Sequence, residues 1–119
     1  MPRNTVTAAI SLAFAIAAGA AVAAVAASTA PVGVTFTLRQ HRFIPDTATA
    51  PAGAKVIVTL INEDASAEEF DSSDLHVEED VTPKARIRFT VGPFKPGVYR
   101  FMGEGHPETA SGRLVIVAP

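Results

Sequence analysis

The sequence predicts an all-β domain, a Greek-key antiparallel β-sandwich that follows an N-terminal signal peptide. Two observations lead to this fold class: short segments alternate apolar and polar residues, and prolines and glycines separate these segments. A third is that no segment after residue 30 repeats apolar residues at helical spacing for more than about a turn. Roughly five to seven short strands in a domain of this size are typical of two packed sheets, and Greek-key wiring is the commonest way to connect them.

The first thirty residues predict an export signal. A single charged residue, Arg3, precedes an alanine-rich apolar run over residues 8–27, with small residues suited to cleavage at 24–26. The run is nearly long enough to cross a bilayer, so an uncleaved anchor is the alternative. We expect residues 1–30 to be a signal peptide or N-terminal anchor and residues 31–119 to be the folded domain. In either case we expect the folded domain to be exported, and to be membrane-anchored if the leader is not cut.

The strands are predicted in order from their patterns. Residues 34–40 alternate, with Val34, Phe36 and Leu38 on one face, and residues 54–62 are β-branched and apolar enough for a central strand. Between them, residues 41–53 carry two prolines and a glycine, which predict a loop with at most a short edge strand. The acidic segment 63–80 shows no sustained period. Residues 85–91 alternate again, and residues 98–102 and 112–118 predict two strands around a final loop.

Composition excludes several functions. The chain contains 10 Lys and Arg against 12 Asp and Glu, a net charge of −2, which becomes −3 (−2 minus 1) without Arg3. Such a balance gives no concentrated basic face, so we expect no nucleic-acid partner. No nucleophile–base arrangement or phosphate-binding glycine loop is present, which argues against hydrolysis and nucleotide chemistry. Whether the chain is an enzyme is left uncertain, and the absence of these motifs favours a non-enzymatic role.

The segment YRFMGEGHPETASGRL, residues 99–114, places a histidine in a glycine-bounded loop between two predicted strands. With PAGAKVIVTLIN (51–62) and KPGVYRF (95–101), it resembles the cupredoxin fold over residues 34–117. Copper-bearing cupredoxins carry the pattern Y-x-F-x-C-x-x-H here, then a methionine, then G-x-L. This resemblance puts His106 at the histidine position and Gly103 at the cysteine position. It also puts Thr109 or Ala110 near the methionine position and Glu69 where an earlier histidine ligand stands.

The lack of cysteine decides one point of chemistry. A blue copper site depends on a thiolate bonded to copper together with two imidazoles. Because the 119 residues contain no cysteine, that site cannot form. We therefore expect no blue copper centre and no copper electron transfer of the ordinary kind.

A narrower resemblance rests on AEEFDSSDLHVE (67–78) together with residues 95–114. These segments are similar to the EfeO-type cupredoxin-like domains associated with iron permeases, although those domains carry cysteines where this chain has Phe43 and Gly103. The resemblance implies binding of iron or copper in the periplasm, with a membrane iron permease and a periplasmic iron-binding protein as partners. It places Glu69, His106 and Glu104 at the metal.

The residues themselves do not decide which metal binds or which side chains hold it. Carboxylate and imidazole donors suit iron, copper(II), manganese or zinc, and a thioether favours copper(I). The candidate metal ligands are Glu69, His106, Glu104, Met102 and Glu68, with an iron or copper ion as the expected cofactor. His41 is not expected to take part, because Arg39 and Arg42 beside it would repel a cation. The alternative is a metal-free β-sandwich interaction module that docks to a transporter or oxidase through its acidic segment. A ferroxidase-like oxidase ranks last, because iron oxidation needs an electron acceptor and one mononuclear site without cysteine offers no relay.

Overall fold

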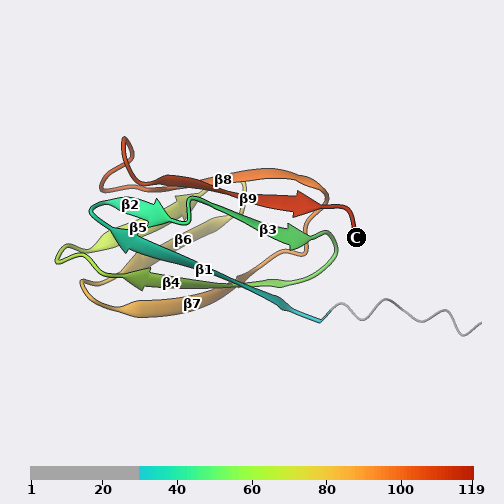
Figure 1. Cartoon of the computed structure of the whole chain (residues 1–119), viewed down its shortest axis with the longest axis horizontal. Helices are drawn as coiled ribbons and strands as arrows, with labels where there is room; N and C mark the ends of the chain where they lie inside the picture. Colours follow the sequence, from blue (N-terminus) through green and yellow to red (C-terminus); the bar gives the residue numbers. More distant parts are fainter. Residues whose placement is uncertain (1–29) are drawn as a thin grey trace, which may run out of the picture.

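The computed structural model describes residues 30–119, which fold into nine strands (Figure 1). The predicted signal peptide or anchor lies, but for its last residue, outside the described residues. Within residues 30–119 no helix is long and apolar enough to cross a bilayer. The strands are β1 (Val32–Arg39), β2 (Arg42–Ile44), β3 (Thr47–Pro51), β4 (Val56–Asn62), β5 (Glu68–Ser72), β6 (Val77–Val81), β7 (Arg86–Val91), β8 (Gly97–Gly103) and β9 (Ser111–Val117).

Two sheets form the sandwich, and the predicted all-β fold is confirmed. One sheet has the strand order β2-β1-β4-β7 and the other β3-β9-β8-β5-β6. The sheets are mixed, since β1 pairs with β4 and β3 pairs with β9 in parallel, while the other neighbours are antiparallel. The parallel pair β1–β4 arises because the chain passes through the other sheet, in β3, before β4 returns beside β1 from the same end.

The sequence prediction located the strands at 34–40, 54–62, 85–91, 98–102 and 112–118, and all five are present with small shifts at their ends. The loop predicted at 41–53 instead holds two short edge strands, β2 and β3. The acidic segment 63–80 holds the hairpin of β5 and β6, which was not predicted. Its inward positions include Glu68 and Ser72, both buried, so polar residues on the core side conceal the alternation.

Aromatic side chains fill the core beneath one end of the sandwich. The ring of Phe101 lies 4.8 Å from that of Phe36, 5.0 Å from that of Phe43 and 4.6 Å from that of Phe70, measured between centroids. Aromatic pairs at such distances add about 0.5–1.5 kcal/mol each beyond the area that they bury. Phe70 shares the buried face of β5 with Glu68, two positions earlier, and Phe101 shares the buried face of β8 with Gly103, two positions later. The cluster therefore fixes these ends of β5 and β8.

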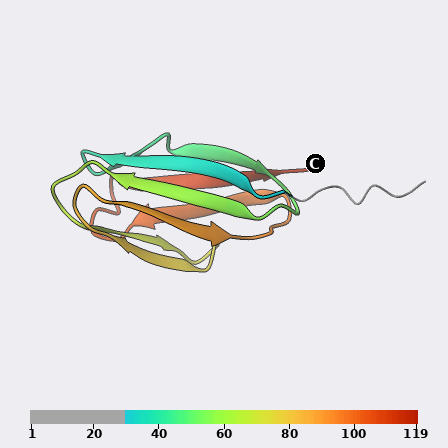
Figure 2. The ribbon, with the colours of Figure 1, turned by 90° about the horizontal axis from the view of Figure 1, so that it is seen from below.

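The strands run along the length of the domain, so the connecting loops gather at its two ends (Figure 1, Figure 2). The β1–β2 turn, the β4–β5 loop and the β8–β9 loop lie at the end opposite the C-terminus. This end is called the loop end below. It brings together segments that are far apart in the sequence.

Candidate functional site

Four of the five predicted ligands lie at the loop end, and they form two separate pairs. Glu68 contacts His106, and Glu69 contacts Glu104, on opposite faces of β5. Met102 lies apart from both pairs. It is 42% exposed on the outer face of β8, because Phe101 takes the inward position.

The inner pair is a buried carboxylate bound to an imidazole. Oε2 of Glu68 lies 2.7 Å from Nδ1 of His106, and the two side chains are 4% and 34% exposed. Oε1 of Glu68 accepts hydrogen bonds from the backbone N–H groups of Gly105, at 2.7 Å, and Glu69, at 3.0 Å. A buried carboxylate is costly unless it is hydrogen-bonded or paired, and these partners meet that requirement.

Two glycines allow the loop to approach this carboxylate. A Cβ atom at Gly103 would lie 2.7 Å from Cδ of Glu68 and 2.8 Å from Cβ of Ala110, which is closer than carbon atoms can pack. A Cβ atom at Gly105 would lie 3.0 Å from Oε1 of Glu68. The carboxyl group of Glu68 therefore fills the space into which a side chain at position 103 would project.

The backbone of the β8–β9 loop holds His106 in place. The N–H of Gly103 donates to the carbonyl of Ala110 at 2.8 Å, and the N–H of Ala110 donates to that of His106, also at 2.8 Å. The N–H of His106 donates to the carbonyl of Gly103 at 3.0 Å. This closed loop aims Nδ1 of the imidazole at the interior rather than at solvent.

His41 joins the site, contrary to the expectation from its basic neighbours. Its ring stacks on that of His106, with centroids 3.6 Å apart and planes 14° apart. Gln40 and His41 form the β1–β2 turn with φ angles of 51° and 58°, and the carboxylate of Asp64 accepts both of their backbone N–H groups, at 2.7 and 3.0 Å. Burial of Asp64 opposes its ionisation, but these two hydrogen bonds, together with the electrostatic effect of His41 and Lys84, outweigh it and lower the pKa of that carboxyl.

The involvement of His41 depends on this turn. Two non-glycine residues with positive φ are uncommon, and a two-residue hairpin loop of this kind gives no glycine signal in the sequence. The spacing of a strand ending at Arg39 and another beginning at Arg42 would have been the only indication.

The outer pair consists of two carboxyl groups beside the edge strand β6. A hydrogen bond with Glu104 is the largest cause that raises the pKa of Glu69 to about 7, and loss of hydration and the negative charges of Glu104, Asp80 and Glu78 add to it. The N–H of Glu104 also donates to the carbonyl of Glu69 at 2.9 Å. The pair borders a shallow depression of about 550 Å³ between β5, β6 and the β8–β9 loop. Two carboxyl groups that share a proton can exchange it for a cation.

Comparison with known proteins identifies the class. The sequence model of the cupredoxin-like domain matches residues 6–116, and the chain therefore belongs to the cupredoxin-like family. An uncharacterised protein of Rickettsia prowazekii (strain Madrid E) is 36% identical over 83 residues, 70% of this chain and 66% of that protein. The chain thus spans about two thirds of the length of that relative.

Solved structures share the fold at low sequence identity. Auracyanin A, a "blue" copper protein from Chloroflexus aurantiacus, has a TM-score of 0.64 and 15% identity, over 73% of this chain and 99% of its own. The metal-binding domain of the Cu(I)-exporting P-type ATPase CopA of Streptococcus pneumoniae D39, solved with Cu(I), has a TM-score of 0.65 and 12% identity, over 73% and 86%. A purple cupredoxin from Nitrosopumilus maritimus has a TM-score of 0.56 and 16% identity, over 71% and 99%.

A thiolate-bound copper ion does not fit this chain. No cysteine is present in the sequence, and Glu68 occupies the space beside Gly103. Within residues 30–119 no three side chains of His, Asp or Glu converge closely enough to hold a metal ion. The donors that do come together are carboxylate oxygens and an imidazole nitrogen, in pairs, and these suit a harder cation than copper(I).

Proposed function

We propose that this protein is a periplasmic metal-binding cupredoxin-like protein that takes part in iron or copper uptake or handling with a membrane permease. One observation supports the proposal above the others. A buried carboxylate, that of Glu68, faces Nδ1 of His106 at 2.7 Å at the loop end of a cupredoxin-like sandwich. A metal would displace the proton of the hydrogen bond between these two groups, take one oxygen and one nitrogen donor from the pair, and complete its coordination with water.

The donor set favours iron(II) or copper(II) over copper(I). Carboxylate oxygen and imidazole nitrogen are borderline-to-hard ligands, and the thioether of Met102 lies on another surface. The outer pair, Glu69 and Glu104, supplies two further carboxyl oxygens next to the inner pair, across the backbone of β5. We propose that metal passes between this outer carboxylate pair and the inner carboxylate–imidazole pair without leaving the loop end, as a handling role in uptake requires.

A titration with single variants tests the proposal. The full chain, stripped with chelator, would be titrated by calorimetry with iron(II) under anaerobic conditions and with copper(II). We expect Glu68→Gln and His106→Gln to weaken binding about tenfold or more, because loss of a group that merely supports a ligand already costs about 10–100-fold. Glu108→Gln serves as the matched control, because Glu108 is exposed on the same loop and the charge change is the same.

Glu69→Gln and Glu104→Gln would separate the two pairs. If the metal binds at the outer pair, these variants weaken its binding, whereas Glu68→Gln leaves the affinity unchanged. If the wild type and all four site variants bound metal with equal affinity, the metal site would not lie at the loop end.

A second function is favoured by a specific observation. Glu68 satisfies its two oxygens within the chain, and its carboxyl group fills the space of a side chain at position 103. A carboxylate–imidazole pair of this kind can take over the structural role of a metal, joining β5 to the β8–β9 loop. The protein would then be a metal-free interaction module that docks to a transporter or oxidase. Copurification of such a membrane partner, with no bound metal in the protein isolated from the periplasm, would support this alternative.

A further inference from the structure

Two arginines face each other on the outer surface of the five-stranded sheet. Arg100 of β8 and Arg113 of β9 are direct partners across the antiparallel pair. Like charges opposite each other destabilise a sheet. Within residues 30–119, no carboxylate lies within 4.0 Å of either guanidinium group. Both positive charges are therefore available to an external anion, in a chain whose net charge is −2.

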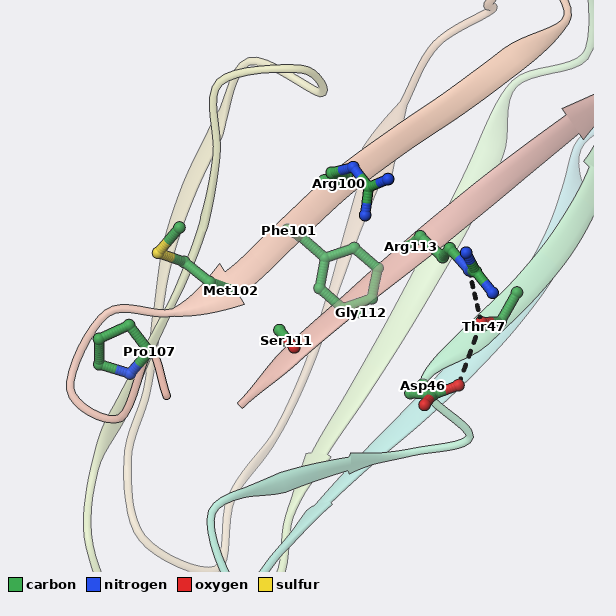
Figure 3. Close-up of a pocket in the computed structure, with 9 residues that line it drawn as sticks. All are labelled: Asp46, Thr47, Arg100, Phe101, Met102, Pro107, Ser111, Gly112 and Arg113. Carbon is green, nitrogen blue, oxygen red and sulfur yellow. Dashed lines mark hydrogen bonds between the residues drawn. The ribbon is translucent and has the colours of Figure 1, made fainter. Parts of the chain in front are cut away.

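The arginines form one half of a surface groove with a volume of about 320 Å³ (Figure 3). The other half is apolar and is lined by Met102, which is 42% exposed, and Pro107. Figure 3 shows these two side chains grouped at one end of the groove and the two arginines at the other, with Ser111 between them. A cationic half and an apolar half thus lie side by side on one rigid sheet.

Neighbouring groups hold the side chain of Arg113 and the backbone of Arg100. Nε of Arg113 donates to the hydroxyl of Thr47 at 3.1 Å, and that hydroxyl donates to Oδ1 of Asp46 at 3.0 Å. Asp46 is the one carboxylate that lines the groove, and it keeps its negative charge while its Oδ1 accepts the hydroxyl of Thr47. The backbone of Arg100 is fixed by Asp74, whose Oδ2 accepts its N–H at 2.8 Å. Arg113 is thus held through Nε, which leaves its terminal amino groups for a ligand.

We propose that this groove binds an acidic peptide segment of a partner protein. A carboxylate lies between the two guanidinium groups, whose planar forks match its geometry. An apolar side chain two residues away in the extended peptide packs beside Met102 and Pro107. The spacing agrees, because Arg100 and Met102 are two residues apart on β8, about 7 Å, as are side chains i and i+2 of an extended peptide.

The chemistry of the groove favours a peptide over an anionic membrane. Recognition of a lipid surface requires a cluster of about 4–8 basic residues. The groove contains two, next to an apolar half that a phosphate group would leave unused. Charge complementarity together with the apolar half therefore identifies the occupant as a carboxylate-bearing segment with a neighbouring aliphatic residue. This inference does not depend on metal binding at the loop end.

Amide chemical shifts would test the proposal. The ¹⁵N-labelled full chain would be titrated with the blocked pentapeptide Gly-Glu-Gly-Leu-Gly at low ionic strength. We expect saturable shifts at Arg100, Met102, Ser111 and Arg113. Replacing the peptide's glutamate by glutamine, or its leucine by serine, should weaken binding, the former by about fivefold, in keeping with an exposed charge pair. Inorganic phosphate should bind more weakly than the parent peptide.

Protein variants complete the experiment. R100Q and R113Q should each reduce peptide affinity by about fivefold. R86Q and R88Q are the matched controls, since these exposed arginines lie on β7 of the other sheet and change the net charge equally. An equal loss in R86Q and R88Q, equal binding of the glutamine peptide, or no shift at millimolar peptide would overturn the proposal. Phosphate binding as tight as that of the peptide, with leucine dispensable, would also overturn it and leave a simple anion site.

Discussion

Glu68 is the residue whose replacement tests the description of the loop end most directly. In Glu68→Ala, three groups lose their acceptor: the N–H groups of Gly105 and Glu69 and Nδ1 of His106, at 2.7, 3.0 and 2.7 Å. Hydrogen bonds to a charged group contribute about 1.5–3 kcal/mol each. Water can reach Gly105 and His106 and can take over part of the lost hydrogen bonding. We therefore expect the free energy of unfolding to fall by about 3–5 kcal/mol, as it does when one partner of a buried ion pair is removed.

Glu68→Gln should cost less than Glu68→Ala. The amide oxygen still accepts from the two backbone N–H groups, and the amide NH₂ can donate to Nδ1 of a neutral imidazole that carries its proton on Nε2. We expect a loss of about 1–2 kcal/mol, close to that of a single hydrogen bond. Glu108→Gln, on the exposed surface of the same loop, should leave the unfolding midpoint unchanged.

Urea denaturation at pH 7 and 25 °C, followed by far-ultraviolet circular dichroism in the presence of chelator, measures these differences without interference from metal. The slope of the transition should stay the same in all variants, so that shifts in midpoint report stability alone. A loss below about 1 kcal/mol in Glu68→Ala would refute the reasoning, since one ordinary hydrogen bond is worth that much. The loop would then be held by its own backbone bonds.

Three further perturbations give expected outcomes. Gly103→Ala should lower the free energy of unfolding by about 1–3 kcal/mol, because the new methyl group overpacks the core. In a urea double-mutant cycle, Gly103→Ala combined with Glu68→Ala should lower it by less than the sum of the two single losses, because the carboxyl group that the new methyl group would contact is then absent. Phe101→Ala should cost about 3–5 kcal/mol by emptying the core beneath the loop end, as measured by calorimetric unfolding; a smaller loss would show that the core collapses around the gap. Wild-type stability should fall between pH 4.5 and about 7, because Glu69 has a raised pKa in the folded state and so keeps a proton, shared with Glu104, that the unfolded state releases. Glu69→Gln should remove this part of the pH dependence, and an unchanged profile would contradict the assignment.

The fold was largely predictable because five strands carry a clear apolar alternation. Residues 85–91 show this best, with Arg86 and Arg88 exposed and Val91 buried as the pattern indicates. Hairpin β5–β6 was not predictable from the same signal, because its inward residues include Glu68 and Ser72. Hydrogen bonds to the β8–β9 loop and to the carbonyl of Arg100 make burial of these polar side chains tolerable, and a linear pattern does not show such partners.

The site was predictable as a region but not residue by residue. The sequence places Glu68 and Glu69 next to each other, and a shift of one position along a strand exchanges the two faces. Phe70 gives the missing information, since its apolar side chain must point inward and the residue two positions earlier shares its face. This argument selects Glu68 for the inner pair. The stacking of His41 on His106 depends on a turn geometry that only the folded chain reveals.

The order of the strands has a consequence for how the domain unfolds. The edge strand β2 continues through two residues into β3, the edge strand of the other sheet, and β6 continues through four residues into β7 in the same way. The chain thus connects the two sheets covalently along both of their long edges. Neither sheet can separate from the other while the β2–β3 and β6–β7 connections stay folded. We therefore expect the amide protons in the central strands of both sheets to exchange with solvent in a single cooperative unfolding step.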